Sequence, residues 1–409
     1  MLRILHTADW HLGKTLDERD RDEEHGLLFD FLLDRIVDEQ VDALLMCGDL
    51  FDSANPPQRA LAQYYGFLSR LRQISHCRVI IIAGNHDSPA LLEAPRELLG
   101  GMDIHVVGKV PAEPYLLALP NEESPQAYVA AVPFLRDGDL RMGVSGQSIA
   151  EIQQELNDGI ASVYERYCRE SPLPLLAMGH LTVMGSEKSQ SEREIHIGGL
   201  GALPVSRFPE GFCYIALGHL HRPQHCGGRS HIRYSGSPIP LSFSEANDRK
   251  EIRLVEITED GLKRNEGMVI PDFRRLIRIE SSVVDALCWM KQINEALEQR
   301  SSRLPAWIEI QLNLPCTDVE LRQAMDDLAK GAEWMGEGKA FEVLRILPMA
   351  RTLSEGAHDD ANTRVGSFDT LGDPRWMFER RLAQTTLLDD QQTEVLRRLF
   401  LQMLEQHGS

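Results

Sequence analysis

The sequence predicts an α/β fold in which helices lie on layered β-sheets, followed by a small α+β segment and a helical C-terminal tail. Three observations predict this organisation. Over residues 1–270, short apolar runs alternate with longer segments in which apolar residues recur at helical spacing, a pattern typical of layered α/β domains. From residue 271 onward, three strand-like runs alternate with two helical patterns. A polar, aperiodic stretch follows, and residues 375–409 return to an amphipathic helical pattern.

Five apolar runs are predicted to be buried strands because they are short, mostly aliphatic and bounded by polar or turn-forming residues. They are residues 2–7, 41–47, 79–83, 175–178 and 214–217. Two helices are predicted between the first three runs, from apolar residues spaced three or four apart. These residues are Leu28, Leu32 and Ile36 in one helix and Leu61, Tyr65, Leu68 and either Leu71 or Arg72 in the other. In sheets with this alternation, functional residues gather where the strands end.

The chain of 409 residues is longer than one hydrophobic core usually supports, so several domains are expected. A small βαβαβ domain is predicted after the main one. Its strands are predicted at residues 276–279, 307–312 and 341–346, and its helices at 283–298 and 318–330. The predicted organisation is a main domain over residues 1–270, the small domain over 271–349, a linker over 350–374 and the helical tail over 375–409.

The composition is ordinary for a globular protein, with 43% hydrophobic and 26% charged residues. No apolar stretch approaches the roughly 18 residues of a membrane span, and the N-terminus lacks the pattern of a secretory signal. The seven cysteines are scattered and form no C-x-x-C pair, which favours reduced thiols in the cytoplasm. The net charge of -19 argues against a generally basic nucleic-acid-binding surface. It does not exclude a nuclease, because divalent cations reverse the local field of a carboxylate-rich site.

Residues of the types that bind metals follow each of the five apolar runs. The motifs are Asp9-Trp10-His11, Gly48-Asp49-Leu50-Phe51-Asp52, Gly84-Asn85-His86-Asp87, Gly179-His180 and Gly218-His219-Leu220-His221. In an extended chain, residues i and i+2 point to the same side, so D-x-H and H-x-H can each direct two side chains into one site. The glycines allow sharp turns and close backbone approach. One such motif alone is more often a turn, but five in this order predict a metal centre.

The ligand types narrow the choice of metal. Carboxylate, amide and imidazole groups together suit Mn, Fe or Zn better than Mg or Ca alone. Two metal ions about 3.5–4 Å apart need a bridging ligand, and a carboxylate can bridge. Asp49 is the natural candidate for that bridge.

The order of the five motifs resembles that of the calcineurin-like metallophosphoesterase superfamily. Within it, the chain is most similar to the D subunits of bacterial SbcCD-type nucleases, and the resemblance extends over nearly the whole chain. The similarity to these D subunits is most specific in residues 6–13, 179–182, 195–198 and 236–243. The resemblance implies a metallophosphoesterase sandwich for the main domain and a capping role for the small one.

The resemblance also implies ligands for two divalent metal ions, which in this family are most often Mn. It implies that one ion is held by Asp9, His11, Asp49 and His221, and the second by Asp49, Asn85, His180 and His219. His86 matches the family's catalytic histidine, which can donate a proton to the leaving oxygen. Asp52 is expected to be a loop cap or a hydrogen-bond acceptor beside the ligands, without a catalytic role.

For function, the resemblance implies an Mn-dependent double-strand exonuclease and hairpin endonuclease acting in DNA repair and recombination. The implied partner is an SbcC-type, SMC-like coiled-coil ATPase on which the tail docks. DNA is the implied substrate, no membrane is involved, and a homodimer within a heterotetramer is implied. The small domain is expected to face DNA, with Arg274 and Arg275 among its candidate contacts.

Two alternatives remain on the sequence alone. The first is a stand-alone phosphatase or cyclic-nucleotide phosphodiesterase of the same superfamily. Protein phosphatases in it carry G-D-x-x-D-R-G and G-N-H-E, whereas here Asp52 is followed by Ser53-Ala54 and His86 by Asp87. The second is a non-enzymatic scaffold, which would typically have lost ligands, whereas this chain keeps all seven.

Overall fold

The computed structural model describes residues 1–136, 140, 148–168, 171–187, 202–300, 302–314, 318–333 and 340–348. The chain divides into two compact units, Met1–Ala350 and Arg351–Ser409, and all described residues belong to the first unit. The predicted linker, the predicted tail and the motif at residues 195–198 lie outside the described residues. In the described part of the chain, no helix is long and apolar enough to cross a membrane.

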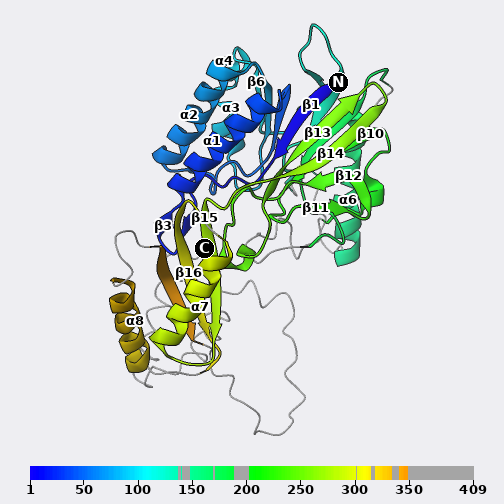
Figure 1. Cartoon of the computed structure of the whole chain (residues 1–409). Coiled ribbons are helices and arrows are strands. Elements are labelled where there is room, and N and C mark those ends of the chain that lie inside the picture. Colours follow the sequence, from blue (N-terminus) through cyan, green and yellow to red (C-terminus); the bar gives the residue numbers. More distant parts are fainter. Residues whose placement is uncertain are drawn as a thin grey trace, which may run out of the picture. The chain divides into compact units, whose positions relative to one another are not determined.

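Two six-stranded sheets form the centre of the first unit. Figure 1 labels β1, β13 and β14 of the first and β10, β11 and β12 of the second. The first sheet has the order β14-β13-β1-β4-β5-β6. Its strands are β1 (Leu2–Thr7), β4 (Ala43–Cys47), β5 (Arg78–Ile82), β6 (Ile104–Val107), β13 (Glu251–Thr258) and β14 (Gly261–Val269). The second sheet has the order β11-β12-β10-β9-β8-β7. Its strands are β7 (Leu117–Leu119), β8 (Ala127–Ala131), β9 (Leu175–His180), β10 (Phe212–Gly218), β11 (Gln224–Cys226) and β12 (Arg229–Tyr234).

Three buried hydrophobic clusters join these sheets to each other and to the helices. The cluster between the sheets includes Leu45 of β4 and Met178 of β9. Helices α1 (Asp22–Asp38) and α2 (Gln58–Ile74) pack on the outer face of the first sheet, and α6 (Ile149–Tyr167) packs on the second. The shorter elements of this part are β2 (Thr15–Leu16), β3 (Arg19–Asp20), α3 (Pro89–Glu93), α4 (Arg96–Gly100), η2 (Val205–Arg207) and η3 (Phe243–Glu245). The predicted layered α/β fold is confirmed.

All five predicted strands are present, as β1, β4, β5, β9 and β10, with ends that differ from the prediction by a few residues at most. Strands β1, β4, β5 and β6 run parallel to one another, and so do β8, β9, β10 and β12. The carboxyl ends of these strands therefore lie at a common edge of each sheet. Strands β13 and β14 were not predicted; β13 pairs antiparallel with β1, and β14 pairs antiparallel with β13 at the edge of the first sheet.

The predicted buried face of α2 is wrong at one position. Tyr65, predicted to face the core, is 40% exposed. Tyr64 is buried instead, and its ring centroid lies 5.7 Å from that of Phe51. The spacing pattern allowed either tyrosine, and packing against the loop after β4 selects Tyr64.

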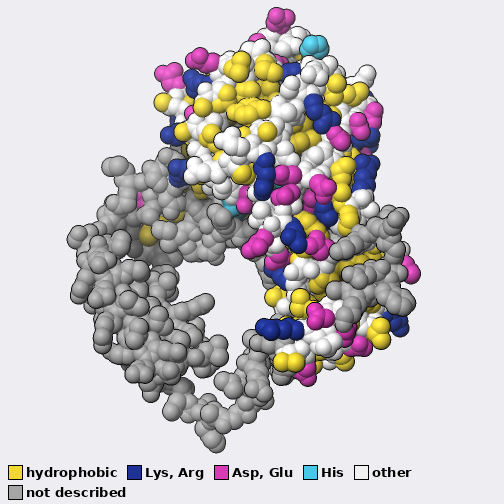
Figure 2. All heavy atoms as spheres, turned by 90° about the vertical axis from the view of Figure 1, so that its left-hand side faces the viewer, with side chains coloured by type: hydrophobic (Ala, Val, Ile, Leu, Met, Phe, Trp, Pro, Cys, Tyr) yellow, Lys and Arg dark blue, Asp and Glu magenta, His cyan; other side chains and the backbone are white. Residues whose placement is uncertain are grey.

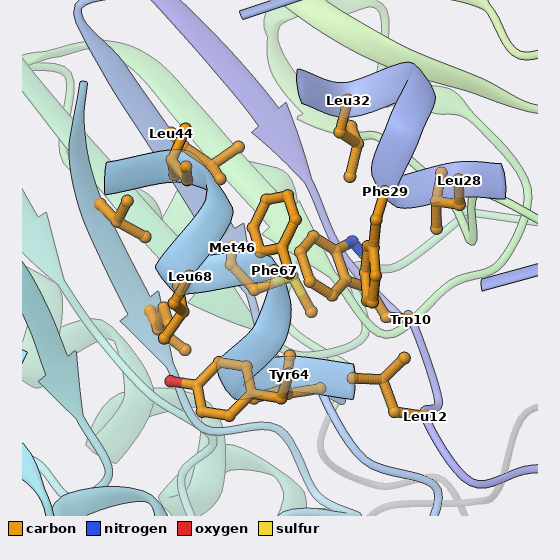
Figure 3. Packing of buried hydrophobic residues seen from close by; sticks show 14 of the residues in the cluster. Trp10, Leu12, Leu28, Phe29, Leu32, Leu44, Met46, Tyr64, Phe67 and Leu68 are labelled. Atoms are coloured by element: carbon orange, nitrogen blue, oxygen red, sulfur yellow. The ribbon is translucent and has the colours of Figure 1, made fainter. Parts of the chain in front are cut away.

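Trp10 anchors the loop that follows β1 to the core beneath α1 and α2, as Figure 3 shows. The centroid of its ring lies 5.2 Å from that of Phe29 on α1 and 5.3 Å from that of Phe67 on α2. Its carbonyl oxygen accepts a hydrogen bond from Nε2 of the buried His25 at 2.8 Å. Asp9 before this tryptophan and His11 after it, both predicted metal ligands, are thereby held in place.

A third, parallel sheet with the order β15-β16-β17 follows the two larger ones. Its elements are β15 (Arg274–Ser281), α7 (Ala286–Gln299), β16 (Leu304–Leu312), α8 (Asp318–Glu333) and β17 (Phe341–Pro348). They form their own hydrophobic cluster around Trp289 and Ile308. The predicted βαβαβ order is confirmed, and the boundaries of the predicted domain over residues 271–349 stay a prediction.

Arg274 connects this third sheet to helix α1. Its guanidinium lies 2.7 Å from Glu23 Oε2 and 3.2 Å from Glu24 Oε1, and 4.3 Å from the ring centroid of Trp307. Arg275 donates to two carbonyl oxygens at the end of α7 and in the residue that follows it. Both arginines are therefore engaged within the protein, which argues against the expectation that they contact DNA.

Candidate metal centre

The seven predicted ligands all lie at or just beyond the carboxyl ends of parallel strands. Asp9 and His11 follow β1, Asp49 follows β4, Asn85 follows β5, His180 ends β9, and His219 and His221 follow β10. All except Asn85 are buried, and Asn85 is partly buried. Residues from both sheets thus meet at one edge of the sandwich.

Four of these residues have left-handed backbone conformations. The φ angles are 55° for Asp9, 48° for His11, 49° for Asp49 and 100° for His219. Positive φ is uncommon for residues other than glycine and costs conformational energy, so it persists where the surroundings hold it and is frequent at functional sites. The strained turns direct these four side chains into the common edge.

Glycines leave the room that the crossing loops require. A Cβ atom at Gly48, whose φ is +84°, would collide with Nδ1 of His180, and one at Gly84 would collide with the carboxylate of Asp49. The loops after β4 and β5 can approach this closely only because positions 48 and 84 are both glycine.

Backbone hydrogen bonds tie the loops of the first sheet together. The amide of Asp9 donates to the carbonyl oxygen of Gly48 at 3.0 Å, and that of His11 donates to the carbonyl oxygen of Asp49 at 3.0 Å. The carboxylate of Asp9 in turn accepts from the amide of His219 at 2.9 Å, which joins the two sheets. The ends of strands from both sheets therefore form one connected unit.

The side chains form two groups that meet at Asp49. Metal-binding atoms of Asp9, His11 and His221 lie within 4.8 Å of one another, and so do those of Asp49, His180 and His219. Oδ2 of Asp49 lies 3.6 Å from Nε2 of His11 and 3.4 Å from Nε2 of His180. One carboxylate oxygen thus stands between an imidazole of each group, the position that a bridging ligand needs. Oδ1 of Asn85 lies 2.9 Å from Nε2 of His180.

The family of the chain is settled by comparison with known proteins. The profile of the calcineurin-like phosphoesterase family matches residues 2–223. The chain belongs to this family. It is 33% identical over 406 residues to the D subunit of the SbcCD nuclease of Escherichia coli (strain K12), covering 98% of this chain and 97% of that protein. The proteins of the same name from Rhodobacter capsulatus and Bacillus subtilis are 38% and 32% identical, over 64% and 76% of this chain and 68% and 79% of theirs.

Three of the candidate histidine ligands donate a hydrogen bond from Nδ1. Nδ1 of His11 donates to Oδ1 of Asp52 at 3.1 Å, and Nδ1 of His180 donates to the carbonyl oxygen of Cys47 at 2.9 Å. Nδ1 of His221 donates to Oε1 of Glu245 at 3.1 Å. Each contact leaves Nε2 for the centre, as in metal sites generally. Nε2 of His11 is buried and has no hydrogen-bond partner among the described residues, which fits an atom that binds a cation.

The electrostatics of the centre favour added positive charge. Burial raises the pKa of Asp9 to about 7. Burial lowers the pKa of His180, but the carboxylates of Asp49 and Asp9 raise it more, to about 9. The carboxylates of Asp49 and Asp9 thus stabilise positive charge at this edge, and the residues present fit a pair of divalent cations.

His86 lies beside these groups with its ring held by other contacts. Nδ1 of His86 donates to the carbonyl oxygen of Asp52 at 2.7 Å, and its amide donates to Oδ1 of Asp49 at 2.9 Å. Its ring centroid lies 4.7 Å from that of His11. Asp52 accepts from His11 and also lies 3.1 Å from Nζ of Lys14, so it orients a candidate ligand, as expected.

Several supporting residues were not predicted. Oε2 of Glu245, behind His221, accepts from Nζ of Lys250 at 2.6 Å, and both side chains are buried. Asp87 accepts the amides of Leu50, Phe51 and Gly84, so its carboxylate joins the loops after β4 and β5. Asp87 stands in the G-N-H-D motif, but nothing in the local sequence around Glu245 or Lys250 marks them as partners of a histidine.

Proposed function

We propose that this chain is the nuclease subunit of a DNA-processing complex and that it hydrolyses DNA phosphodiesters at a two-metal centre. Its family makes it a phosphoesterase. The observation that carries the proposal is the pair of residue groups that share Asp49 at one edge of the sandwich. Relatives named as nuclease subunits, similar over nearly the whole chain, support DNA as the substrate.

We assign one cation to Asp9, His11, Asp49 and His221, and the second to Asp49, Asn85, His180 and His219. Mixed carboxylate, amide and imidazole ligation supports Mn. When bound, such ions would neutralise phosphate charge and supply an activated water.

The chain's own residues position the reaction around these ions. Nδ1 of His86 is committed to the carbonyl oxygen of Asp52, so Nε2 is the nitrogen that can carry a proton to the leaving oxygen. Asp49 aligns the two groups, and its Oδ1 holds the backbone of His86. The proton donor and the bridging carboxylate are therefore set at a fixed spacing.

The partner proposals extend beyond the centre. We propose an SbcC-type, SMC-like ATPase as partner, docked through residues 375–409, and a DNA-facing role for residues 271–349, in the bacterial cytoplasm on the nucleoid. Both exonuclease action on duplex ends and hairpin opening belong to this proposal. Each of these relatives is named as a subunit of the SbcCD nuclease, which supports a partner subunit.

We also propose that two copies of the chain associate. Figure 2 shows hydrophobic side chains gathered over the upper part of the face turned toward the viewer. Val37 on α1, Tyr65 and Ile74 on α2 and Leu98 on α4 are 40–71% exposed. Exposed apolar surface of this kind is typical of a protein interface and supports a homodimer.

The test is hydrolysis of blunt duplex DNA, hairpin DNA and a chromogenic phosphodiester, with Mn²⁺ or with a chelator, and with or without the ATPase. We expect Mn-dependent cleavage of both DNA substrates that the chelator abolishes. Hydrolysis of the chromogenic substrate alone, with no DNA cleavage in the complete complex, would instead indicate a stand-alone phosphodiesterase.

A further inference from the structure

A hollow with a volume of about 360 Å³ adjoins the metal centre on the side of His180. It lies between the loop after β6, the segment after β8 and helix α6. Phe134 lines it, and the ring of Phe134 meets that of His180 edge-on, with centroids 6.3 Å apart. Pro89, two residues beyond Asp87 of the G-N-H-D motif, lines it as well. The hollow and the centre therefore share a wall.

The charge of this hollow is opposite to that of the chain. Lys109, Arg136 and Arg166 line it, and all three are exposed. No carboxylate is among the described residues that line it, although the whole chain carries a net charge of -19. Three cations around one concave surface form a local site for an anion.

The loop that carries Lys109 has a defined conformation. The amides of Gly108 and Lys109 donate to Oε1 of Glu93 at 2.9 and 3.2 Å. A Cβ atom at Gly108 would lie 2.9 Å from the carbonyl oxygen of Pro89, so the loop packs closely against the start of α3. Arg166 donates to the carbonyl oxygen of Ala112 at 2.6 Å and fixes the far end of the same loop.

We propose that this basic hollow, defined by Lys109, Arg136 and Arg166, binds a backbone phosphate of the DNA strand that is cut. A phosphodiester at the metal centre has further phosphates along the same strand, and the hollow lies directly beside the centre. Lysine and arginine contacts to such phosphates set the register of a strand without reading its sequence. The inference rests on the proposed nuclease function and adds to it a subsite that positions the strand.

The test compares the double variant Lys109→Ala/Arg166→Ala with wild type in the full chain. Binding of a labelled single-stranded oligodeoxynucleotide is measured by fluorescence anisotropy over a range of salt concentrations, with chelator present so that no cleavage occurs. Affinity should fall about tenfold, and the slope of log K against log salt should decrease by roughly 0.7 for each phosphate that the variant no longer binds. With Mn²⁺, the loss of kcat/KM on blunt duplex DNA should exceed the loss on a chromogenic phosphodiester by about the same factor.

The matched control is Lys263→Ala/Arg264→Ala. It removes the same two residue types from β14, at the opposite edge of the first sheet from β6, and should leave binding and its salt slope at the wild-type values. Because Arg166 also holds the loop, Lys109→Ala alone should shift the salt slope in the same direction. Thymidine monophosphate at equal phosphate concentration should displace the oligonucleotide poorly.

The outcomes separate this inference from the function on which it rests. An unchanged salt slope, equal losses on both substrates, or equal displacement by the free nucleotide would overturn the strand subsite. A wild-type complex that hydrolyses the chromogenic substrate but cuts no DNA would overturn the nuclease function instead. The binding titration requires no cleavage, so it tests the strand subsite whether or not the chain cuts DNA.

Discussion

Replacing Glu245 with glutamine should weaken cation binding on the His221 side of the metal centre. Glu245 is fully buried, and its Oε1 accepts the Nδ1 hydrogen of His221 at 3.1 Å. This hydrogen bond holds the tautomer in which Nε2 of His221 is left for a cation. The amide oxygen of glutamine can still accept from Nδ1 but carries no negative charge, so it supports the imidazole more weakly. Mutation of such a supporting residue typically lowers metal affinity by roughly 10- to 100-fold, which corresponds to about 1.4–2.8 kcal/mol of binding free energy.

The same substitution leaves the buried ammonium of Lys250 without its counter-ion. Nζ of Lys250 lies 2.6 Å from Oε2 of Glu245, and the two side chains are 5% and 0% exposed. Removing one partner of a buried ion pair costs about 3–5 kcal/mol of unfolding free energy. The double variant Glu245→Gln/Lys250→Met removes the unpaired charge, so it should recover most of the stability but not the metal affinity.

Calorimetric titration with Mn²⁺, metal counting by mass spectrometry and thermal denaturation measure these effects separately. We expect Glu245→Gln to bind one ion with near wild-type affinity and the other more weakly. Wild-type affinity for both ions in the double variant would show that Glu245 supports the fold only, and that the tautomer argument is wrong.

The pH dependence provides a second measurement on the same residue. Burial raises the pKa of Glu245, but Lys250 and His221 outweigh it and hold that pKa well below the usual value of 4.5. A group whose pKa is depressed by folding stabilises the protein above its unfolded pKa, and this stability is lost as the pH falls. The unfolding free energy of wild type should therefore drop more steeply below about pH 4.5 than that of Glu245→Gln. Parallel curves would contradict the assigned ion pair.

Further substitutions test the rest of the assignment. Asp49→Asn should lose more than one bound metal ion and more activity than Asp9→Asn, because the bridge serves both groups; two retained ions would contradict the bridge. His86→Ala should keep both ions and lose roughly 10²–10⁴ in rate on DNA, the usual size of a general-acid contribution; a near wild-type rate would remove His86 from the mechanism. Deleting residues 375–409 should preserve hydrolysis of a chromogenic phosphodiester and abolish co-purification with the ATPase, whereas a stable complex of normal stoichiometry would show that the tail is not the main dock. Arg274→Ala should lower the unfolding free energy by about 1–3 kcal/mol through loss of charged hydrogen bonds, measured by urea denaturation, and unchanged stability would show that its contacts to α1 contribute nothing.

The strands and the motifs that follow them could be predicted because both signals are local. An apolar run marks a buried strand, and D-x-H or H-x-H directly after it places two side chains on one side. The structure brings Asp9, His11 and His221 into one group and Asp49, His180 and His219 into another. His219 and His221 of the H-x-H motif therefore lie in different groups, a division that the motif alone does not predict. The pairing of β1 with β13 joins residues about 250 positions apart, such as Leu2 and Ile257. No local sequence pattern predicts this pairing.

The supporting residues could not be predicted for a related reason. Glu245 and Lys250 lie 24 and 29 positions beyond His221 in the chain, and no local pattern connects them to that histidine. Arg274 shows the opposite error: a basic residue in a segment expected to face DNA is held by Glu23 and by the ring of Trp307. Charge in a sequence indicates possible partners, and only the packing shows which partner is used.

The groups of the metal centre also hold the two sheets of the sandwich together. The carboxylate of Asp9 accepts an amide from the loop after β10, and the imidazole of His180 on β9 donates to the end of β4. Each contact crosses from one sheet to the other, and each involves a residue that is also a candidate ligand. Because the strained turns at Asp9 and Asp49 persist only while these contacts exist, assembly of the sandwich and formation of the centre are coupled. The centre is therefore preorganised by the fold, and the cations we propose would stabilise the same arrangement that the hydrogen bonds already select.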